Sequence, residues 1–387
     1  MTNKTVLISG ASIAGPALAF WLSRQGYAVT VVERSPELRA GGQAVDFKGA
    51  THLAVLERMG ILDEIRRQQT GGLDQTIVDA EGRPIAVLPG EFTGGDVEIR
   101  RGDLARILYD RTSADCEYVF GDSITSLTET PDGVDVTFER EAPRRFDLVF
   151  GADGIHSAVR RLAFGPEADY VEHLGHYYAL VETDETDGGP AVMYNEPGRM
   201  AATGGPKATA FFVFASPEIS YDRYDIGRQK EILTAAFEGG GWRLPEVMER
   251  VKRSDDVYLD SIARVKMDGY TTGRVALLGD AAYGNTLGGF GTGLAVVAAY
   301  VIAGELAAAN GDHELAFRRY DEKFSDYAKV ARNANAGSFL APPTKLRIKL
   351  RDQMFKRRLL LRGMLWVTDK FATDITLDEY PALARQG

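Results

Sequence analysis

The chain of 387 residues is 44% hydrophobic and 26% charged, a balance that excludes wholesale disorder and indicates a soluble protein of two or three structural units. Its net charge of -10 argues against a protein that chiefly binds nucleic acid. A single cysteine excludes an internal disulfide, and neither a signal peptide nor a bilayer-spanning run is expected, which favours a cytoplasmic protein without stable membrane insertion.

Strand and helix patterns alternate along the chain. A strand at 6–8, a helix from 17–22 and a strand at 29–33 predict a β-α-β unit. Alternating apolar and aromatic residues from 177 to 215 indicate strands. The other predicted elements are helices at 102–113, 227–237, 244–252 and 292–309, and strands at 123–129, 134–139, 146–151, 257–265 and within 274–280. This order predicts a nucleotide-binding α/β domain, interrupted by a mainly β domain and closed by C-terminal helices.

A glycine-bearing loop, Gly10-Ala11-Ser12-Ile13-Ala14-Gly15, joins the first strand to its helix. Glycines there permit a tight turn and let backbone amides approach a pyrophosphate at the helix N-terminus. Ser12 takes the place of the usual middle glycine, but Glu33 ends the second strand, where an acidic residue accepts hydrogen bonds from ribose hydroxyls. The unit therefore favours a dinucleotide site over an ordinary turn.

Two later segments also follow predicted strands. The second runs from Gly151 to Arg160, and the third is Gly279-Asp280-Ala281-Ala282-Tyr283, followed by the glycine-rich residues 288–293. Each alone could be a helix-capping turn, with Asp153 or Asp280 accepting from the next amides. Three such segments in this order are much less expected by chance.

Together the three segments resemble the motifs of class A FAD-dependent aromatic hydroxylases, over nearly the whole chain. Asp153-Gly154, Ser157 and Arg160 match a D-G-x-x-S-x-x-R motif, and Gly279-Asp280-Ala281-Ala282 match one that begins G-D-A. Residues 41–46, 101–104 and 299–306 are similar to the tetracycline-inactivating branch especially. The resemblance implies a Rossmann-like FAD-binding domain (1–73, 95–170 and 268–340), an inserted β-sheet substrate domain (74–94 and 171–267) and a C-terminal helical segment (341–387).

The resemblance also implies roles for individual residues. Arg39 would contact NADPH, a transient hydride donor. No catalytic side chain is required, because a flavin 4a-hydroperoxide delivers oxygen to an electron-rich ring while the protein positions that ring and excludes water. For charged residues such as Arg39 and Arg160, a surface salt bridge is the alternative interpretation. FAD would be bound by Gly10, Ser12, Ala14, Gly15, Glu33, Arg34, Asp46, Arg101, Asp153, Asp280, Gly289, Gly291, Thr292 and Gly293.

The sequence departs from the family at the third motif. Tyr283 stands where a histidine commonly follows, and Thr286-Leu287 stand where a proline is usual, which puts reactivity and substrate class in doubt more than FAD binding. Phe212 and Phe214 share one face of a predicted strand, and Phe290 lies among glycines, so these three rings are the expected substrate contacts. The five histidines show no metal-binding spacing, so no metal site is predicted.

We therefore expect a monomeric enzyme that uses NAD(P)H and dioxygen to hydroxylate a phenolic or polycyclic aromatic substrate. The alternative is a flavoprotein that sequesters an aromatic drug without oxygenating it. A flavin-dependent halogenase is rejected, since Trp21, Trp242 and Trp366 lie too far apart to form its tryptophan motif. The basic segment 345–370 has three interpretations: a membrane-surface helix, a helix packed on the core, or a helix bridging both domains.

Overall fold

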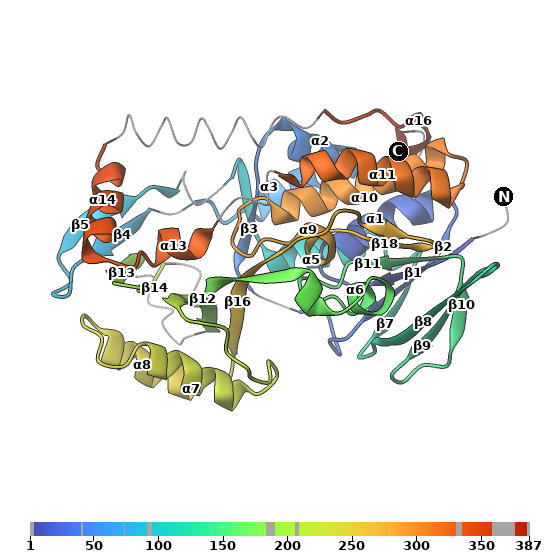
Figure 1. Cartoon of the computed structure of the whole chain (residues 1–387). Coiled ribbons are helices and arrows are strands. Elements are labelled where there is room, and N and C mark those ends of the chain that lie inside the picture. The colour runs from blue at the N-terminus through green and yellow to red at the C-terminus, as the bar shows by residue number, and fades with distance from the viewer. Residues whose placement is uncertain are drawn as a thin grey trace.

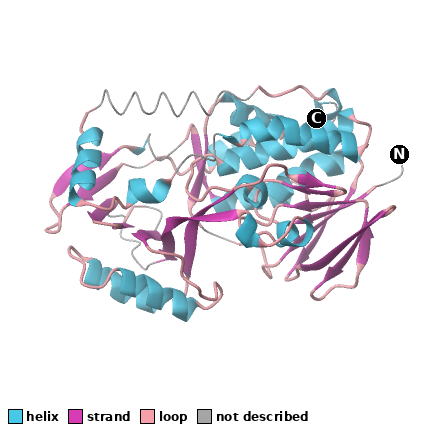
Figure 2. Ribbon diagram, viewed as in Figure 1, coloured by secondary structure: helices cyan, strands magenta, loops and turns pink. Residues whose placement is uncertain are grey.

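The computed structural model describes residues 4–39, 42–72, 74–90, 95–182, 190–205, 209–329, 335–357 and 376–384. Figure 1 shows two bodies, each built around its own sheet, and the fold class is mixed α/β. The first strand, β1 (Thr5–Ser9), and the last described helix, α16 (Pro381–Ala384), belong to the same body. The strands and helices of both bodies are distinguished in Figure 2.

The first body contains a six-stranded sheet in the order β17-β18-β11-β1-β2-β7. The strands from β18 to β7 run parallel, and β17 pairs antiparallel at one edge. Their apolar residues are buried on both faces, as expected for a covered parallel sheet. The strands are β1 (Thr5–Ser9), β2 (Ala28–Glu33), β7 (Glu117–Phe120), β11 (Leu148–Gly151), β17 (Thr271–Thr272) and β18 (Val275–Leu277).

Helices and a small sheet cover the two faces of this sheet and share one hydrophobic core with it. On one side lie α1 (Ala14–Arg24), α2 (Ala50–Arg58), α3 (Leu62–Arg67), α5 (Arg101–Asp110), α10 (Gly291–Ala308) and α11 (His313–Tyr327). On the other lies an antiparallel meander of β8 (Ile124–Thr130), β9 (Gly133–Phe138) and β10 (Arg144–Phe146).

Helix α10 is apolar around its whole circumference. Its 18 residues have a mean hydropathy of 1.6, enough by length and composition to cross a membrane. However, 78% of that stretch is buried inside the protein, between α1, α2 and α11. A helix that is hydrophobic all round is equally the central helix of a large core, and its packing here is that of a core helix.

The second body contains a seven-stranded sheet in the order β16-β12-β15-β14-β13-β4-β5. All neighbours are antiparallel except the parallel pair β13 and β4. One face is covered by α7 (Ile226–Ala236) and α8 (Leu244–Arg253). The strands are β4 (Gln75–Val78), β5 (Pro84–Leu88), β12 (Val171–Glu182), β13 (Val192–Glu196), β14 (Arg199–Thr203), β15 (Thr209–Ala215) and β16 (Val257–Val265).

The opposite face of this sheet is directed towards the first body and the C-terminal region. Its side chains pack with those of α13 (Ala336–Leu340) and α14 (Lys345–Phe355). The last helix, α16 (Pro381–Ala384), packs on α10 of the first body. Short elements lie between the two bodies: the antiparallel pair β3 (Ala44–Phe47) and β6 (Val97–Arg100), α6 (Ala158–Ala163), a 3-10 turn (Glu167–Asp169) and α9 (Asp280–Tyr283). The second sheet therefore faces the edge of the first body at which the sequence motifs lie.

Candidate active site

The three motifs meet at the carboxyl edge of the six-stranded sheet. The first follows β1, the second follows β11 and the third follows β18, while Glu33 ends β2. These four strands are adjacent in the order β18-β11-β1-β2, so segments separated by more than 240 residues in sequence lie side by side. Ligands of open parallel sheets bind outside the carboxyl ends of the strands.

The glycines of the first motif are required by contacts with backbone atoms. Gly10 has a φ of +107, and a Cβ there would lie 2.3 Å from the carbonyl oxygen of Ala152 in the second motif. A Cβ on Gly15 would lie 1.9 Å from the Gly10 carbonyl oxygen. The loop thus lies tightly against the second motif and the start of α1, leaving the α1 N-terminus as a cradle for a diphosphate.

Arg101 places a cation beside this loop. The Nε of Arg101 donates a hydrogen bond of 3.1 Å to the Oγ of Ser12. Arg101 begins α5 immediately after β6, and its side chain is exposed. The serine that departs from the glycine pattern therefore has a structural use, since it orients a guanidinium that could pair with a pyrophosphate.

The acidic residue at the end of β2 is fixed at the mouth of the loop. Glu33 accepts a hydrogen bond from the Ala11 amide (2.9 Å) and another from the Ser35 amide (2.8 Å). Arg34 instead points across to the second body, where it donates to the Tyr224 hydroxyl (2.6 Å) and lies over that ring. Arg39 is exposed in the loop after β2, so its predicted contact with NADPH stays a prediction.

Asp153 has its carboxylate engaged by its own chain. It accepts from the Ala158 amide (2.9 Å), the Val159 amide (3.2 Å) and the Ser157 hydroxyl (2.5 Å), and burial raises the pKa of this carboxyl. The helix-capping interpretation therefore describes the Asp153 side chain. Its role towards FAD, which stays a prediction, would be to hold the turn against which Gly10 packs.

Arg160 is fully buried and links the second motif to the third. One guanidinium nitrogen donates to the Ala281 carbonyl (2.9 Å) and the other terminal nitrogen to the Ile155 carbonyl (2.5 Å). The interpretation of Arg160 as a surface salt-bridge residue is wrong, because none of its side chain reaches solvent. It instead joins the loop of the second motif to that of the third through two backbone carbonyls.

Asp280 differs from Asp153 in its accessibility. Asp280 is exposed, yet the protein atoms around it raise the pKa of its carboxyl, while Arg101 lowers that pKa. The carboxyl is thus open to a ligand although protein surrounds it. Its Oδ1 would lie 3.2 Å from a Cβ on Gly291, so Asp280 adjoins the N-terminus of α10.

The glycines before α10 leave backbone amides accessible. Gly289 has a φ of +83 and is exposed, and Gly291 and Thr292 are half-buried in the first turn. At Gly293 a Cβ would lie 2.2 Å from Cε1 of the buried His52, so only glycine fits beside that ring. Burial lowers the pKa of His52 to about 4, which leaves this imidazole neutral at physiological pH. The N-terminal end of an 18-residue helix is therefore free to stabilise negative charge.

Tyr283, which replaces the usual histidine, lies in the core. Its hydroxyl accepts from the Gly279 amide (2.9 Å) and donates to the Leu294 carbonyl (3.3 Å), and its ring packs on Tyr270 and Phe324. Burial raises its pKa well above the usual value. Only 2% of Tyr283 is exposed, so its side chain offers almost no surface to a ligand, and the effect of this departure on reactivity stays a prediction.

The prediction that Phe212 and Phe214 contact substrate is also wrong. Both rings are buried on the face of β15 that is covered by α7, and both pack edge-on against Phe237. The strand alternates, so Phe211 and Val213 occupy the face directed towards α13 and the first body. Sequence alone could not say which face was the inner one.

Two further predicted residues keep positions compatible with their roles. Phe290 is half-buried at the start of α10 and packs at the margin of the main core, so its contact with substrate stays a prediction. Asp46 is half-buried on β3, opposite Glu98 of β6. Its proximity to a flavin ring likewise stays a prediction.

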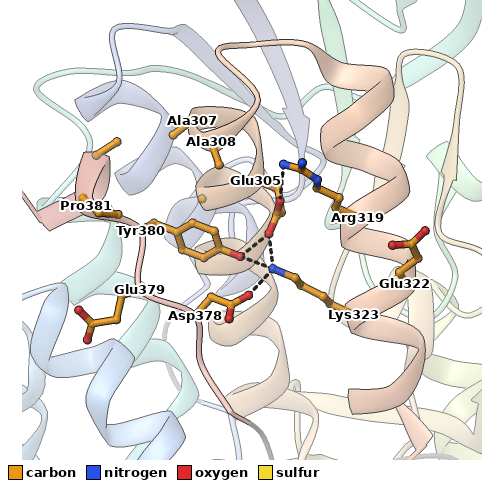
Figure 3. A pocket seen from close by; sticks show the side chains of 12 residues that line it. Glu305, Ala307, Ala308, Arg319, Glu322, Lys323, Asp378, Glu379, Tyr380 and Pro381 are labelled. Carbon is orange, nitrogen blue, oxygen red and sulfur yellow. Dashed lines mark hydrogen bonds and ion pairs between the residues drawn. The ribbon is translucent and has the colours of Figure 1, made fainter.

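The C-terminal region contacts both bodies. Buried Arg351 of α14 donates to Asp352 and to Asn195 of the second sheet. Further on, the Tyr380 hydroxyl donates to the buried Glu305 of α10 (2.7 Å), which Lys323 also contacts, beside a cavity of about 550 Å³ (Figure 3). The described part of the predicted basic helix, α14, packs on the second sheet, as the core-packing interpretation expects. Residues 358–375, over which it would bridge the two bodies, lie outside the described part of the chain, so the bridging interpretation stays a prediction.

Comparison with known proteins agrees with this geometry. A family model for an FAD binding domain matches residues 3–195. A flavin-dependent monooxygenase of Legionella longbeachae is 35% identical over 390 residues, covering 98% of both chains. An uncharacterized protein of Mycobacterium tuberculosis H37Rv is 40% identical over 84% of this chain and 91% of its own length. The crystal structure of tetracycline destructase Tet(55) superposes with a TM-score of 0.82 at 33% identity, covering 97% of this chain and 99% of that chain.

Proposed function

Because this chain belongs to the FAD-dependent monooxygenases, in the group of aromatic hydroxylases and tetracycline destructases, we propose that it uses NAD(P)H and dioxygen to hydroxylate a phenolic or polycyclic aromatic compound. The observation that carries the proposal is the convergence of Gly10, Glu33 and Asp280 at the carboxyl edge of one parallel sheet. The likeness to a tetracycline destructase supports tetracycline-like polyketides as substrates of this chain, which would make the reaction an antibiotic modification.

The residues present fit FAD. The first glycine loop and Arg101 would bind the pyrophosphate, Glu33 the adenosine ribose, and Asp280 the ribityl or pyrophosphate part. The accessible amides at the start of α10 would stabilise negative charge on the reduced ring system. When bound, FAD supplies the redox chemistry by accepting a hydride and activating dioxygen.

The second sheet would supply substrate positioning and water exclusion. The face that carries Phe211, Val213 and Tyr178 is apolar and lies against Leu287 of the third motif and against α13. An aromatic substrate held between this face and the cofactor loops would be shielded from water and oriented for oxygen transfer.

The direct test is aerobic NADPH oxidation by the FAD-loaded protein with tetracycline and a panel of phenolic polyketides, followed by mass spectrometry. We expect at least one compound to stimulate NADPH oxidation and to gain one oxygen atom. Binding without any oxygenated product would instead support drug sequestration. One argument for that alternative was the replacement of the usual histidine by Tyr283, and it is weakened because Tyr283 is buried. Failure of the protein to retain FAD would overturn both.

A further inference from the structure

A hydrogen-bonded network of four side chains joins the two bodies near the proposed cofactor site. His156 belongs to the second motif, and its Nε2 lies 3.1 Å from Oδ1 of Asp260 on β16. Its Nδ1 lies 2.9 Å from Glu167, which follows α6. On the other side of Asp260, the Tyr258 hydroxyl donates a hydrogen bond of 2.8 Å to Oδ2. The order is therefore Glu167, His156, Asp260 and Tyr258.

The groups of this network favour one another's charged forms. Burial disfavours the Asp260 carboxylate, but hydrogen bonds from His156 and Tyr258 outweigh it and lower the pKa of Asp260. Burial likewise disfavours the His156 cation, but Asp260 and Glu167 outweigh it and raise the pKa of His156, against the opposing field of Arg223. His156 thus lies between two carboxylates that favour its protonated form, and its hydrogen bond in turn favours the ionised form of Asp260, whose Oδ2 accepts from Tyr258.

Tyr258 lies on the face of the second sheet that looks towards the first body. Residues 258, 260 and 262 share one face of β16, and the cross-strand partners of Tyr258 and Asp260 are Leu180 and Tyr178. Ile262 and Tyr178 belong to the apolar cluster that includes Leu287 of the third motif, which identifies this face. Leu259, on the other face, packs under α7 and α8.

Tyr258 remains accessible at this junction. Of its surface 39% is exposed, yet the surrounding protein and then the charge of Asp260 raise the pKa of its phenol, which therefore stays protonated. Arg101, which bonds Ser12 in the glycine loop, lowers the pKa of both Tyr258 and Tyr178. Tyr258 and Tyr178 therefore lie close enough to the proposed pyrophosphate site for the charge of Arg101 to act on all three.

The direction of the hydrogen bond determines what Tyr258 can recognise. Its single proton is given to Asp260, so towards a ligand its oxygen can only accept. Donation to a carboxylate also increases the accepting strength of that oxygen. The Tyr178 hydroxyl already hydrogen-bonds this oxygen, which as a phenol oxygen can accept one further hydrogen bond. A ligand hydroxyl would supply that bond, whereas an ether or carbonyl oxygen would meet another acceptor.

We propose that Tyr258 is a specificity-determining residue that accepts a hydrogen bond from a hydroxyl group of the aromatic substrate, and that Asp260 and His156 are positioning residues for it. The proposal rests on the proposed function and narrows its substrate class to aromatic compounds with a free hydroxyl. A site built around a buried polar partner discriminates strongly against the analogue that lacks the matching group.

The test measures binding of two probes, 1-naphthol and 1-methoxynaphthalene, to the FAD-loaded protein by flavin fluorescence. We expect the wild type to bind the naphthol at least about tenfold more tightly, the factor lost with one hydrogen bond to a polar group. Tyr258→Phe, which keeps the ring, should bring the two dissociation constants within about twofold of each other. His156→Gln should reduce the discrimination partly, because Asp260 would lose one of its two side-chain partners.

The matched control is Tyr221→Phe. The Tyr221 hydroxyl donates to the Leu259 carbonyl (2.9 Å), so this variant also loses one hydrogen bond next to β16, but from the opposite face of the sheet. It should keep the wild-type discrimination, and melting temperatures of all variants report whether each is folded.

The outcomes separate this inference from the proposed function. Equal affinities for both probes in the wild type, or intact discrimination in Tyr258→Phe, would overturn the role of Tyr258 while leaving hydroxylation untouched. Absence of binding by either naphthalene would overturn the aromatic substrate class, and this inference with it.

Discussion

The two sheets position functional groups by different means. At the six-stranded sheet, the cofactor loops are held by contacts between backbone atoms, as at Gly10 and Gly15, and by side chains engaged with neighbouring amides, as at Asp153. At the seven-stranded sheet, the face of each side chain is set by strand register and by which helices cover it. Close backbone contacts can be recognised in the sequence because they exclude all residues but glycine. The face of the sheet on which a strand side chain lies cannot be recognised in this way.

The largest effect is expected from a substitution that disrupts the backbone contacts of the first glycine loop. In Gly15→Ala the added methyl group would lie 1.9 Å from the Gly10 carbonyl oxygen, and backbone atoms on both sides cannot move away as a side chain can. We expect a destabilisation above about 4 kcal/mol and loss of FAD retention, measured by thermal unfolding and by flavin absorbance after purification.

Gly269→Ala is the matched control for this substitution. A Cβ at Gly269 would meet only Asp321, at 3.5 Å, which is an ordinary contact distance. This variant should keep its melting temperature within a few degrees and remain yellow. A stable Gly15→Ala protein with bound FAD would show that the close contact between α1 and the loop is not needed.

The second prediction concerns the seven-stranded sheet. Phe212→Ala removes a fully buried ring that packs against Phe237, so we expect it to cost about 3–5 kcal/mol in the free energy of unfolding. Substrate affinity per folded molecule should remain unchanged, because the ring faces α7 rather than the first body.

Phe290→Ala should affect the kinetics rather than the stability. Its ring is half-buried beside the accessible N-terminus of α10, so its loss should change the substrate Michaelis constant or the peroxide released per NADPH more than the melting temperature. If Phe212→Ala altered substrate affinity and Phe290→Ala only stability, the assignment of the two faces would be reversed.

These cases show how far the sequence could predict the site. The motif loops and the mixed α/β fold follow from residues such as Gly10 and Asp280, because their chemistry is local and their spacing is regular. The positions of Tyr283 and Arg160 could not be predicted, because their partners, Leu294 and Ala281, are set by tertiary packing. Tyr258 and Asp260 were missed altogether, although their alternation on a predicted strand was the one available signal.

The third prediction compares the two acidic motif residues. Asp280→Ala should weaken FAD binding roughly tenfold to hundredfold while leaving the protein without FAD as stable as before, because this carboxyl is exposed. Asp153→Ala should instead lower the stability by about 1–3 kcal/mol, since two amides and two hydroxyls, those of Ser157 and Ser9, lose their acceptor.

Equilibrium dialysis with FAD and denaturant unfolding of the FAD-free proteins would separate the two effects. Unchanged FAD affinity in Asp280→Ala would remove the assignment of that carboxyl to the cofactor. Unchanged stability in Asp153→Ala would mean that the hydrogen bonds at the start of α6 contribute nothing net.

The smallest expected effect is a pH dependence at the contact between the two bodies. The pKa of His156 is raised in the folded protein, so its contribution to stability is fully present below its unfolded value near 6.5 and is lost as the pH rises through the folded pKa. The pKa values of Asp260 and Glu167 are lowered, so their contributions are present above their ordinary values of 3.8 and 4.5 and are lost as the pH falls. His156, Asp260 and Glu167 therefore all contribute fully to the stability of the folded protein only between about pH 4.5 and 6.5.

His156→Gln should therefore lower the melting temperature most within that window, and the difference from the wild type should shrink towards pH 9 as the wild-type imidazolium loses its proton. The other charged groups acting on this cluster are Arg223, on both His156 and Glu167, and Arg160, on Glu167. The control is His313→Gln, because burial and Arg274 lower the pKa of His313 and its contribution must vary with pH in the opposite sense. A difference for His156→Gln that is equal at pH 6 and pH 9 would show that the imidazole holds Asp260 without its positive charge.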